Sequence, residues 1–119
     1  MIKTKSVYYD KAEESDGVRI LVMRRWCRPL SKKKAKIDEW LQELGPSKEL
    51  LEQWNKNLIS WDEYKIRYLK EMKAQTGLIE NLAKRAKKET ITLLCKESTD
   101  EYCHRRLLKK LIENRKSLE

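Results

Sequence analysis

The sequence has little of several residues on which whole classes of site depend. Glycine occurs three times in 119 residues, so there is no glycine-rich loop of the kind that cradles phosphates. Histidine occurs once, and the three cysteines form no Cys-x2-Cys pair, so a standard zinc spacing is absent. No group of neighbouring carboxylates suits two-metal chemistry, which argues against a nuclease. We therefore expect no resident metal and no cofactor.

Long hydrophobic runs are also lacking. No apolar run approaches the roughly 18 residues of a membrane span, and residues 1–5 lack the apolar stretch of a signal peptide. We expect a cytoplasmic protein with reduced thiols and no membrane association, although intracellular proteins of hyperthermophiles can carry disulfides. Without a repeat or a low-complexity linker, residues 1–119 are expected to form a single domain. The sequence does not fix the oligomeric state.

Charge of one sign is in excess. Lysine and arginine number 28 against 19 aspartates and glutamates, for a net charge of +9. A basic balance favours acidic partners such as nucleic acid, phosphates or a membrane surface. The same enrichment in charged residues is typical of thermophile surfaces that carry ion-pair networks. Both interpretations are open at this point.

Hydrophobic periodicity indicates strands that alternate with helices. Strands are expected over residues 18–23 and 90–94, with a short β-prone patch at 6–9. Helices are expected over 32–36, 47–57, 61–76, 78–86 and 98–115. Residues 37–44 fit either a helix or a strand. The alternation predicts an α/β fold with a largely parallel sheet flanked by helices.

Turn and capping residues set the expected helix ends. Ser31 is a good N-cap, and Ser60 with Glu63 forms a capping box. Ser98 stands at the same spacing before Glu101, so the last helix is expected to begin near residue 98. Gly77 is expected to end the helix that begins after Ser60. That helix should direct the following side chains to the core: Tyr64, Tyr68, Leu69 and Met72.

Two segments follow expected strands, where ligand sites of parallel sheets lie. They are residues 24–28 and residues 95–105. In the second segment, His104 falls in the middle of an apolar helical stripe that must face the sheet. The stripe consists of Leu107, Leu108, Leu111 and Ile112. His104 should therefore point inward, one turn from the helix start, toward the strand end that carries Cys95.

This constellation suits thiol chemistry. A cysteine near a helix N-terminus, beside histidine and arginine, has a lowered pKa and forms a thiolate. The catalytic candidates are Cys95, Cys103 and His104, while Glu97 and Arg105 are candidates for binding. The alternative is structural, because small thiols and an inward histidine are also common in cores.

Two other chemistries fit the spacing less well. A metal site would use the Cys-x7-Cys-His run from Cys95 to His104, with Cys27 or Glu97 as a fourth ligand, and this is not a standard zinc spacing. A cysteine phosphatase needs a short loop from the strand-end cysteine to an arginine that opens the helix. Ten positions separate Cys95 from Arg105, so that chemistry is excluded.

The run from Leu93 to Leu108 resembles the Leu-Leu-Cys-x-Glu and Cys-His-Arg motif of domain-of-unknown-function family 488, and the N-terminal half resembles its YeaO-like branch. The matching residues of that half are Arg19, Ile20, Leu21, Val22, Arg24, Trp26, Arg28, Leu30, Ser31, Lys32, Trp40, Leu41, Pro46, Ser47, Leu50, Trp61, Arg67 and Tyr68. The resemblance covers about residues 5–113 and implies a small α/β domain. It supplies no reaction.

The chain departs from the YeaO-like pattern at two places. Cys27 stands where the branch has proline, so Cys27 is outside the pattern, and Met23 stands where the branch often has aspartate. Arg24, Trp26 and Arg28 match the branch, and we expect them to form a second wall of the site.

Two main functions follow. The first is a Cys/His/Arg pocket for a small anionic ligand or for thiol-dependent chemistry, with the question of catalysis left open. The alternative is a nucleic-acid-binding module, in which basic clusters contact phosphates and Trp26 and Trp61 stack on bases. The basic clusters are Lys32 to Lys34, Lys84 to Lys88, and Arg105 to Lys110. A purely structural or protein-interaction role is a third possibility, and nothing in the sequence identifies a residue that would contact a partner.

Overall fold

A computed structural model describes residues 1–114 of the chain. Four parallel strands form one sheet in the order β1-β4-β2-β3. The strands are β1 (Ile2–Ser6), β2 (Val18–Leu21), β3 (Glu39–Trp40) and β4 (Ile91–Cys95). The carboxyl ends of β1 and β4 lie side by side, because Ser6 pairs with Cys95. The expected α/β fold with a parallel sheet is confirmed.

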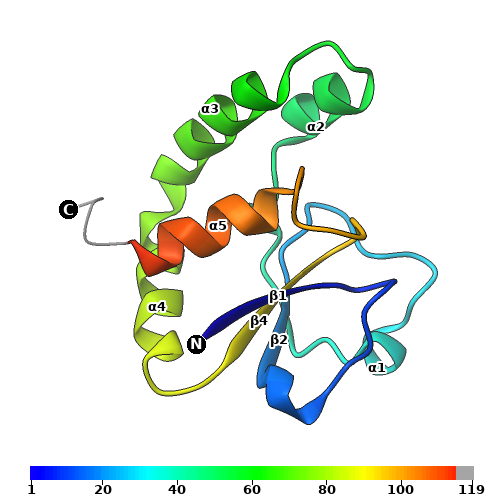
Figure 1. The fold of residues 1–119 in the computed structure, drawn as a ribbon, viewed down its shortest axis with the longest axis vertical. Coiled ribbons are helices and arrows are strands. Elements are labelled where there is room, and N and C mark those ends of the chain that lie inside the picture. Colours follow the sequence, from blue (N-terminus) through cyan, green and yellow to red (C-terminus); the bar gives the residue numbers. More distant parts are fainter. Residues whose placement is uncertain (115–119) are drawn as a thin grey trace.

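Helices cover the sheet on both sides. They are α1 (Lys32–Ala35), α2 (Lys48–Asn55), α3 (Trp61–Met72), α4 (Thr76–Ala86) and α5 (His104–Glu113), with short 3-10 turns at Glu14–Asp16, Gln42–Leu44 and Lys73–Gln75. In Figure 1 the strands pass between α1 and the group formed by α3 and α4, while α5 contacts β1 and β4. No helix within residues 1–114 has the length and apolar character needed to cross a bilayer.

The two faces of the sheet bury two separate hydrophobic clusters. Side chains alternate along a strand, so Ile20 and Leu93 pack with α3, α4 and α5, whereas Leu21 and Leu94 face the other way. The smaller cluster contains Val7, Leu21, Cys27, Ala35, Ile37 and Leu94. By the same alternation Cys95 points toward the α5 side. Cys27 therefore lies across the sheet from Cys95.

A buried carboxylate organises the edge of the sheet near β1 and β2. The Asp16 side chain has no exposed surface and lies 2.5 Å from Arg19 Nη1, 2.7 Å from Lys5 Nζ and 3.1 Å from Lys3 Nζ. Its Oδ2 also accepts the backbone N–H of Glu13 at 3.0 Å. Burial alone would raise the pKa of Asp16, but the hydrogen bonds from Lys5, Glu13, Lys3 and Arg19 outweigh it, so the pKa is far below its usual value.

The expected element bounds are correct in most places and wrong in several. The first strand lies at Ile2–Ser6 rather than at 6–9. Its side chains are mostly polar, so hydrophobic periodicity does not reveal it, and the strand forms because its backbone pairs with β4. Residues 37–44 contain both a two-residue strand and a 3-10 turn. Gly77 does not end a helix, since it lies in the first turn of α4, where an added Cβ would meet no other part of the fold within 4 Å. Leu69 is exposed rather than buried.

The last helix starts later than the capping pattern suggests. Residues 96–103 form a loop, and α5 begins at His104 with Cys103 at the N-cap position. Ser98 is exposed and caps no helix. The loop persists because Arg105 holds it, as described for the site below. Ser60, in contrast, accepts the backbone N–H of Glu63 at 3.1 Å as expected.

The two serines provide a direct stability comparison. Replacing Ser60 with alanine removes the N-cap of α3 and should lower the free energy of unfolding by about 1 kcal/mol. Replacing Ser98 with alanine is the matched control and should change it by less than about 0.5 kcal/mol. Urea denaturation of both variants measures the difference. An equal loss in the two variants would contradict the α5 start at His104.

Candidate functional site

Cys95 is the last residue of β4, and its side chain faces the start of α5. The neighbouring strand β2 runs into Val22, whose backbone N–H donates to Leu94 at 3.0 Å. The carboxyl ends of these two central strands therefore lie next to each other. This is the place where ligand sites form in open parallel sheets.

Arg105 holds the loop between β4 and α5. Its guanidinium is buried and donates to the backbone carbonyls of Cys95 at 3.3 Å and Glu97 at 2.9 Å, and to Asp100 Oδ1 at 2.6 Å. The other oxygen of Asp100 accepts the Thr4 hydroxyl at 2.5 Å. Arg105 thus positions the loop, and the N–H groups of its Nε and Nη1 atoms bond to protein groups rather than to a ligand.

His104 is the first residue of α5, not one turn inside the helix. Its ring lies 3.9 Å from the Sγ atoms of both Cys95 and Cys103, measured at Nδ1. The opposite nitrogen, Nε2, lies 2.5 Å from the Val22 carbonyl oxygen. A carbonyl accepts only, so Nε2 carries the proton that it donates, and Nδ1 faces the two sulfurs. The inward direction expected from the apolar stripe of α5 is confirmed.

The three groups change one another's protonation. A hydrogen bond from the Cys103 thiol is the largest cause of a pKa of Cys95 well below its usual value, and His104 adds to it against the opposing effect of burial. The hydrogen bond to Cys95, together with burial, raises the pKa of Cys103. Burial opposes a charged His104, but the Cys95 thiolate outweighs it and raises the pKa of His104. The arrangement favours a Cys95 thiolate beside a His104 imidazolium.

A pocket of about 420 Å³ opens onto this cluster. Its walls come from the ends of β2 and β4, the loop before α5, and α2 and α3. The lining residues are Met23, Arg24, Arg25, Pro46, Lys48, Leu51, Glu52, Trp54, Asn55, Lys56, Tyr64, Cys95, Lys96, Glu97, Tyr102, Cys103 and His104. The volume falls within the range of small-molecule sites.

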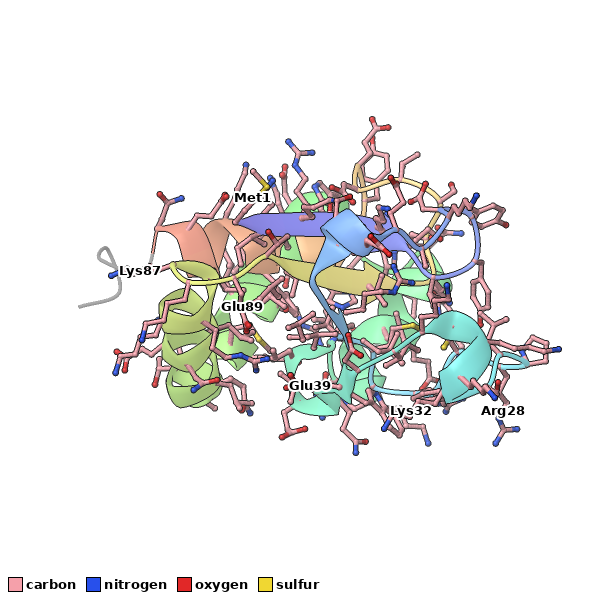
Figure 2. The ribbon with its side chains drawn as sticks, turned by 90° about the horizontal axis from the view of Figure 1, so that it is seen from below. Met1, Arg28, Lys32, Glu39, Lys87 and Glu89 are labelled. Atoms are coloured by element: carbon pink, nitrogen blue, oxygen red, sulfur yellow. The ribbon has the colours of Figure 1, made fainter. Side chains whose placement is uncertain are left out.

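The predicted binding residues divide between the pocket and the rest of the molecule. Arg24 and Glu97 line the pocket with the catalytic candidates. Trp26 packs on Trp40 at 5.2 Å between ring centroids and donates to the Leu30 carbonyl, outside the pocket lining. Arg28 is exposed beside α1 at the periphery (Figure 2). The expected second wall is therefore represented by Arg24 alone, because the turn after Val22 directs residues 26–28 to the other face of the sheet.

Arg24 is held against a glycine. Its guanidinium donates to the carbonyls of Gly45 at 3.0 Å and Pro46 at 3.3 Å. A Cβ at Gly45 would lie 2.5 Å from the Arg24 backbone nitrogen, so only glycine permits this approach. Two of the five guanidinium donors are used in these bonds, and the other three have no partner within residues 1–114 and can contact a ligand.

The aromatic wall of the pocket could not be predicted from the sequence. It consists of Trp54 from α2, Tyr64 from α3 and Tyr102 from the loop before α5. Trp54 lies 5.3 Å from Tyr64 and 6.4 Å from Tyr102 between ring centroids. The helical periodicity indicates that Tyr64 is buried, but no local pattern associates rings on three separate elements.

The same cluster has the donor set of a metal site. The ligand atoms of Cys95, Cys103 and His104 all lie within 4.8 Å of one another. Cys27, one of the two fourth ligands weighed from the sequence, lies in the cluster across the sheet. Three protein ligands that face a pocket match the open coordination of catalytic zinc rather than a closed structural site.

Comparisons with known proteins give the family. A family model described as "Active DUF488-N3 subclade" matches residues 2–116, nearly the whole chain. The chain belongs to the DUF488 family. This agrees with the resemblance found in the Cys-x-Glu and Cys-His-Arg residues, and it adds no substrate.

Similar curated proteins agree with this family assignment. The chain is 40% identical to "Uncharacterized protein YeaO" of Escherichia coli (strain K12) over 93 residues, 78% of this chain and 80% of that protein. It is 32% identical to "Uncharacterized protein Rv3073c" of Mycobacterium tuberculosis (strain ATCC 25618 / H37Rv) over 72 residues, 60% of this chain and 61% of that protein. No solved structure matches the chain.

Proposed function

We propose that this DUF488 protein binds a small anionic ligand in the pocket and that the Cys95 thiolate reacts with it. The observation that carries the proposal is the position of His104, whose Nδ1 lies 3.9 Å from Cys95 Sγ while Nε2 is fixed on the Val22 carbonyl. A nucleophile beside an oriented imidazole is the arrangement that thiol-dependent catalysis requires. A cation, Arg24, lines the same pocket.

The groups have complementary roles in this proposal. Cys95 Sγ forms a bond to an electrophilic atom of the ligand, and the bond from that atom to its leaving group breaks. The leaving group takes the electron pair, and the Nδ1–H of His104 donates the proton. Cys103 stabilises the thiolate by donating its S–H to Cys95. Arg105 is a positioning residue, because it fixes the backbone carbonyl of Cys95.

The alternative function, nucleic-acid binding through the basic clusters, has less support among the described residues. Arg105 is buried, and Arg85 forms ion pairs with Glu39 at 2.5 Å and Glu89 at 3.3 Å. Each of these arginines is therefore committed to a protein partner. Trp26, one of the two proposed stacking residues, is packed against Trp40.

Iodoacetamide labelling at pH 6 tests the reactive thiolate. Cys95 is expected to react fastest of the three cysteines, since the pKa values of Cys27 and Cys103 are raised and their thiols stay protonated. Peptide mass spectrometry measures the rate at each cysteine after treatment with a chelator. Cys95→Ser should abolish the fast labelling, and the matched control Cys27→Ser should preserve it.

Two outcomes would overturn the proposal. One is equal rates at the three cysteines, or labelling only when the chain unfolds. The other is labelling of Cys95 that appears only after the chelator removes a bound metal. The second outcome would identify Cys95, Cys103 and His104 as metal ligands instead.

A further inference from the structure

We propose that the ligand of this pocket is a planar aromatic ring joined to an anionic group, as in a nucleotide, with the ring on the aromatic wall and the anion among the surrounding cations. The inference rests on the proposed function, since the ligand is the molecule that reaches Cys95. It adds the chemical class of that molecule.

The aromatic wall presents rings to the space in front of Cys95. Tyr102 is 54% exposed although it lies within 5.5 Å of Trp61 and 6.4 Å of Trp54 between ring centroids. The three rings come from three elements and line the same cavity as the thiols. Tyr102 and Trp54 are the partly exposed members, whereas Tyr64 is 2% exposed and is stacked between Trp61 and Tyr68. The partly exposed faces of Tyr102 and Trp54 favour a ligand with a flat π surface, because stacking covers both surfaces.

Cations surround the same space in excess. Arg24, Arg25, Lys48, Lys56 and Lys96 line the pocket with the carboxylates of Glu52 and Glu97. Lys56 and Glu52 pair with each other at 2.8 Å, which leaves four cations facing one carboxylate. Cavities lined by one sign of charge concentrate ligands of the opposite sign. An anionic group on the ligand is therefore favoured, and a neutral aromatic compound is not sufficient.

The size of the pocket limits how the ring is presented. About 420 Å³ accommodates one ring with its attached anionic group. A base paired within a duplex keeps both of its faces stacked, so it cannot lie on the aromatic wall. The shared chemistry is thus one unpaired nucleotide, either free or within a single strand.

Binding measurements on the folded Cys95→Ser variant test the ligand class without interference from reaction. The probes are an equimolar mixture of the four ribonucleoside 5′-monophosphates, the matching nucleosides, ribose 5-phosphate, a ten-nucleotide single strand of mixed sequence and its duplex. We expect the monophosphates or the single strand to bind at least about tenfold more tightly than nucleosides, ribose 5-phosphate and duplex. Binding of the monophosphates identifies a free nucleotide, and binding of the single strand alone identifies a strand.

A pair of tyrosine variants localises the binding. Tyr102→Leu should weaken binding of the preferred probe about tenfold, because it removes a ring of the aromatic wall. Tyr9→Leu is the matched control, since Tyr9 is 74% exposed and does not line the pocket. Equal affinity for duplex and single strand, binding by ribose 5-phosphate as tight as by the monophosphates, or an unchanged affinity in Tyr102→Leu would overturn the ligand class.

Protection of the wild-type thiol separates this inference from the proposed function. The preferred probe should slow iodoacetamide labelling of Cys95 at pH 6. Fast labelling of Cys95 with no binding of any probe would overturn the ligand class and leave the thiolate intact. Tight binding of a probe to a protein whose Cys95 is inert would do the reverse.

Discussion

Replacing Asp16 with asparagine is expected to lower the free energy of unfolding at pH 7 by about 3–5 kcal/mol. This is the largest of the predicted effects on stability. The carboxylate is fully buried and is the common partner of Lys3, Lys5 and Arg19. Its removal leaves three neighbouring cations without their shared anion. Urea denaturation at pH 7 measures the loss.

The effect of Asp16 should depend on pH in a defined direction. Its pKa is lower in the folded protein than in the unfolded chain, so its contribution is complete above the unfolded pKa of about 3.9 and is lost as pH falls toward the folded pKa. The difference between wild type and Asp16→Asn should therefore shrink between about pH 5 and pH 2. Asp62→Asn removes an exposed partner of Lys65 and serves as a control with little effect at any pH. A wild-type advantage that stays constant down to pH 2 would contradict the account.

Replacing His104 with glutamine is expected to slow iodoacetamide labelling of Cys95 at pH 6 by about tenfold or more. Glutamine can still donate to the Val22 carbonyl, but it carries no positive charge to stabilise the thiolate. The rates should converge near pH 9, where Cys95 is ionised in both proteins. Residue-resolved labelling between pH 5 and pH 9 measures the shift.

Arg106→Gln provides the control for this change. Arg106 is exposed on the same helix and is absent from the pocket lining, so its loss removes a charge without touching the site. The labelling rate at pH 6 should stay at the wild-type value. If circular dichroism shows that the His104→Gln protein is folded and its Cys95 is labelled as fast as in wild type, the imidazole does not stabilise the thiolate.

The sequence predicted the elements that dominate the site. Cys95 at a strand end and His104 on the apolar stripe of the last helix follow from periodicity, and the structure brings both together with Cys103. The error in the start of α5 arose because Ser98 and Glu101 have capping-box spacing. Spacing cannot reveal that Arg105 would anchor the preceding loop through Asp100 and two carbonyls.

The pocket walls were harder to predict for a related reason. Arg24 follows β2 and Glu97 follows β4, and both line the pocket. Trp26 and Arg28 also follow β2, but they lie outside the pocket lining. A turn of a few residues decides which face of the sheet a side chain reaches, and its conformation is not encoded in periodicity. The aromatic wall depends on tertiary packing of α2 and α3, which no local pattern contains.

The most direct test of the account is a thiolate titration of Cys95 by ultraviolet absorbance at 240 nm. The titration uses a Cys27→Ser protein freed of metal by chelation, with Cys27→Ser/Cys95→Ser as the blank. We predict that the absorbance assigned to Cys95 persists below pH 7, because Cys103 and His104 stabilise the charged form. Absorbance that appears only with a midpoint near 8.5 or above, the ordinary range of a cysteine, would contradict the claim that Cys95 is the reactive centre of the pocket.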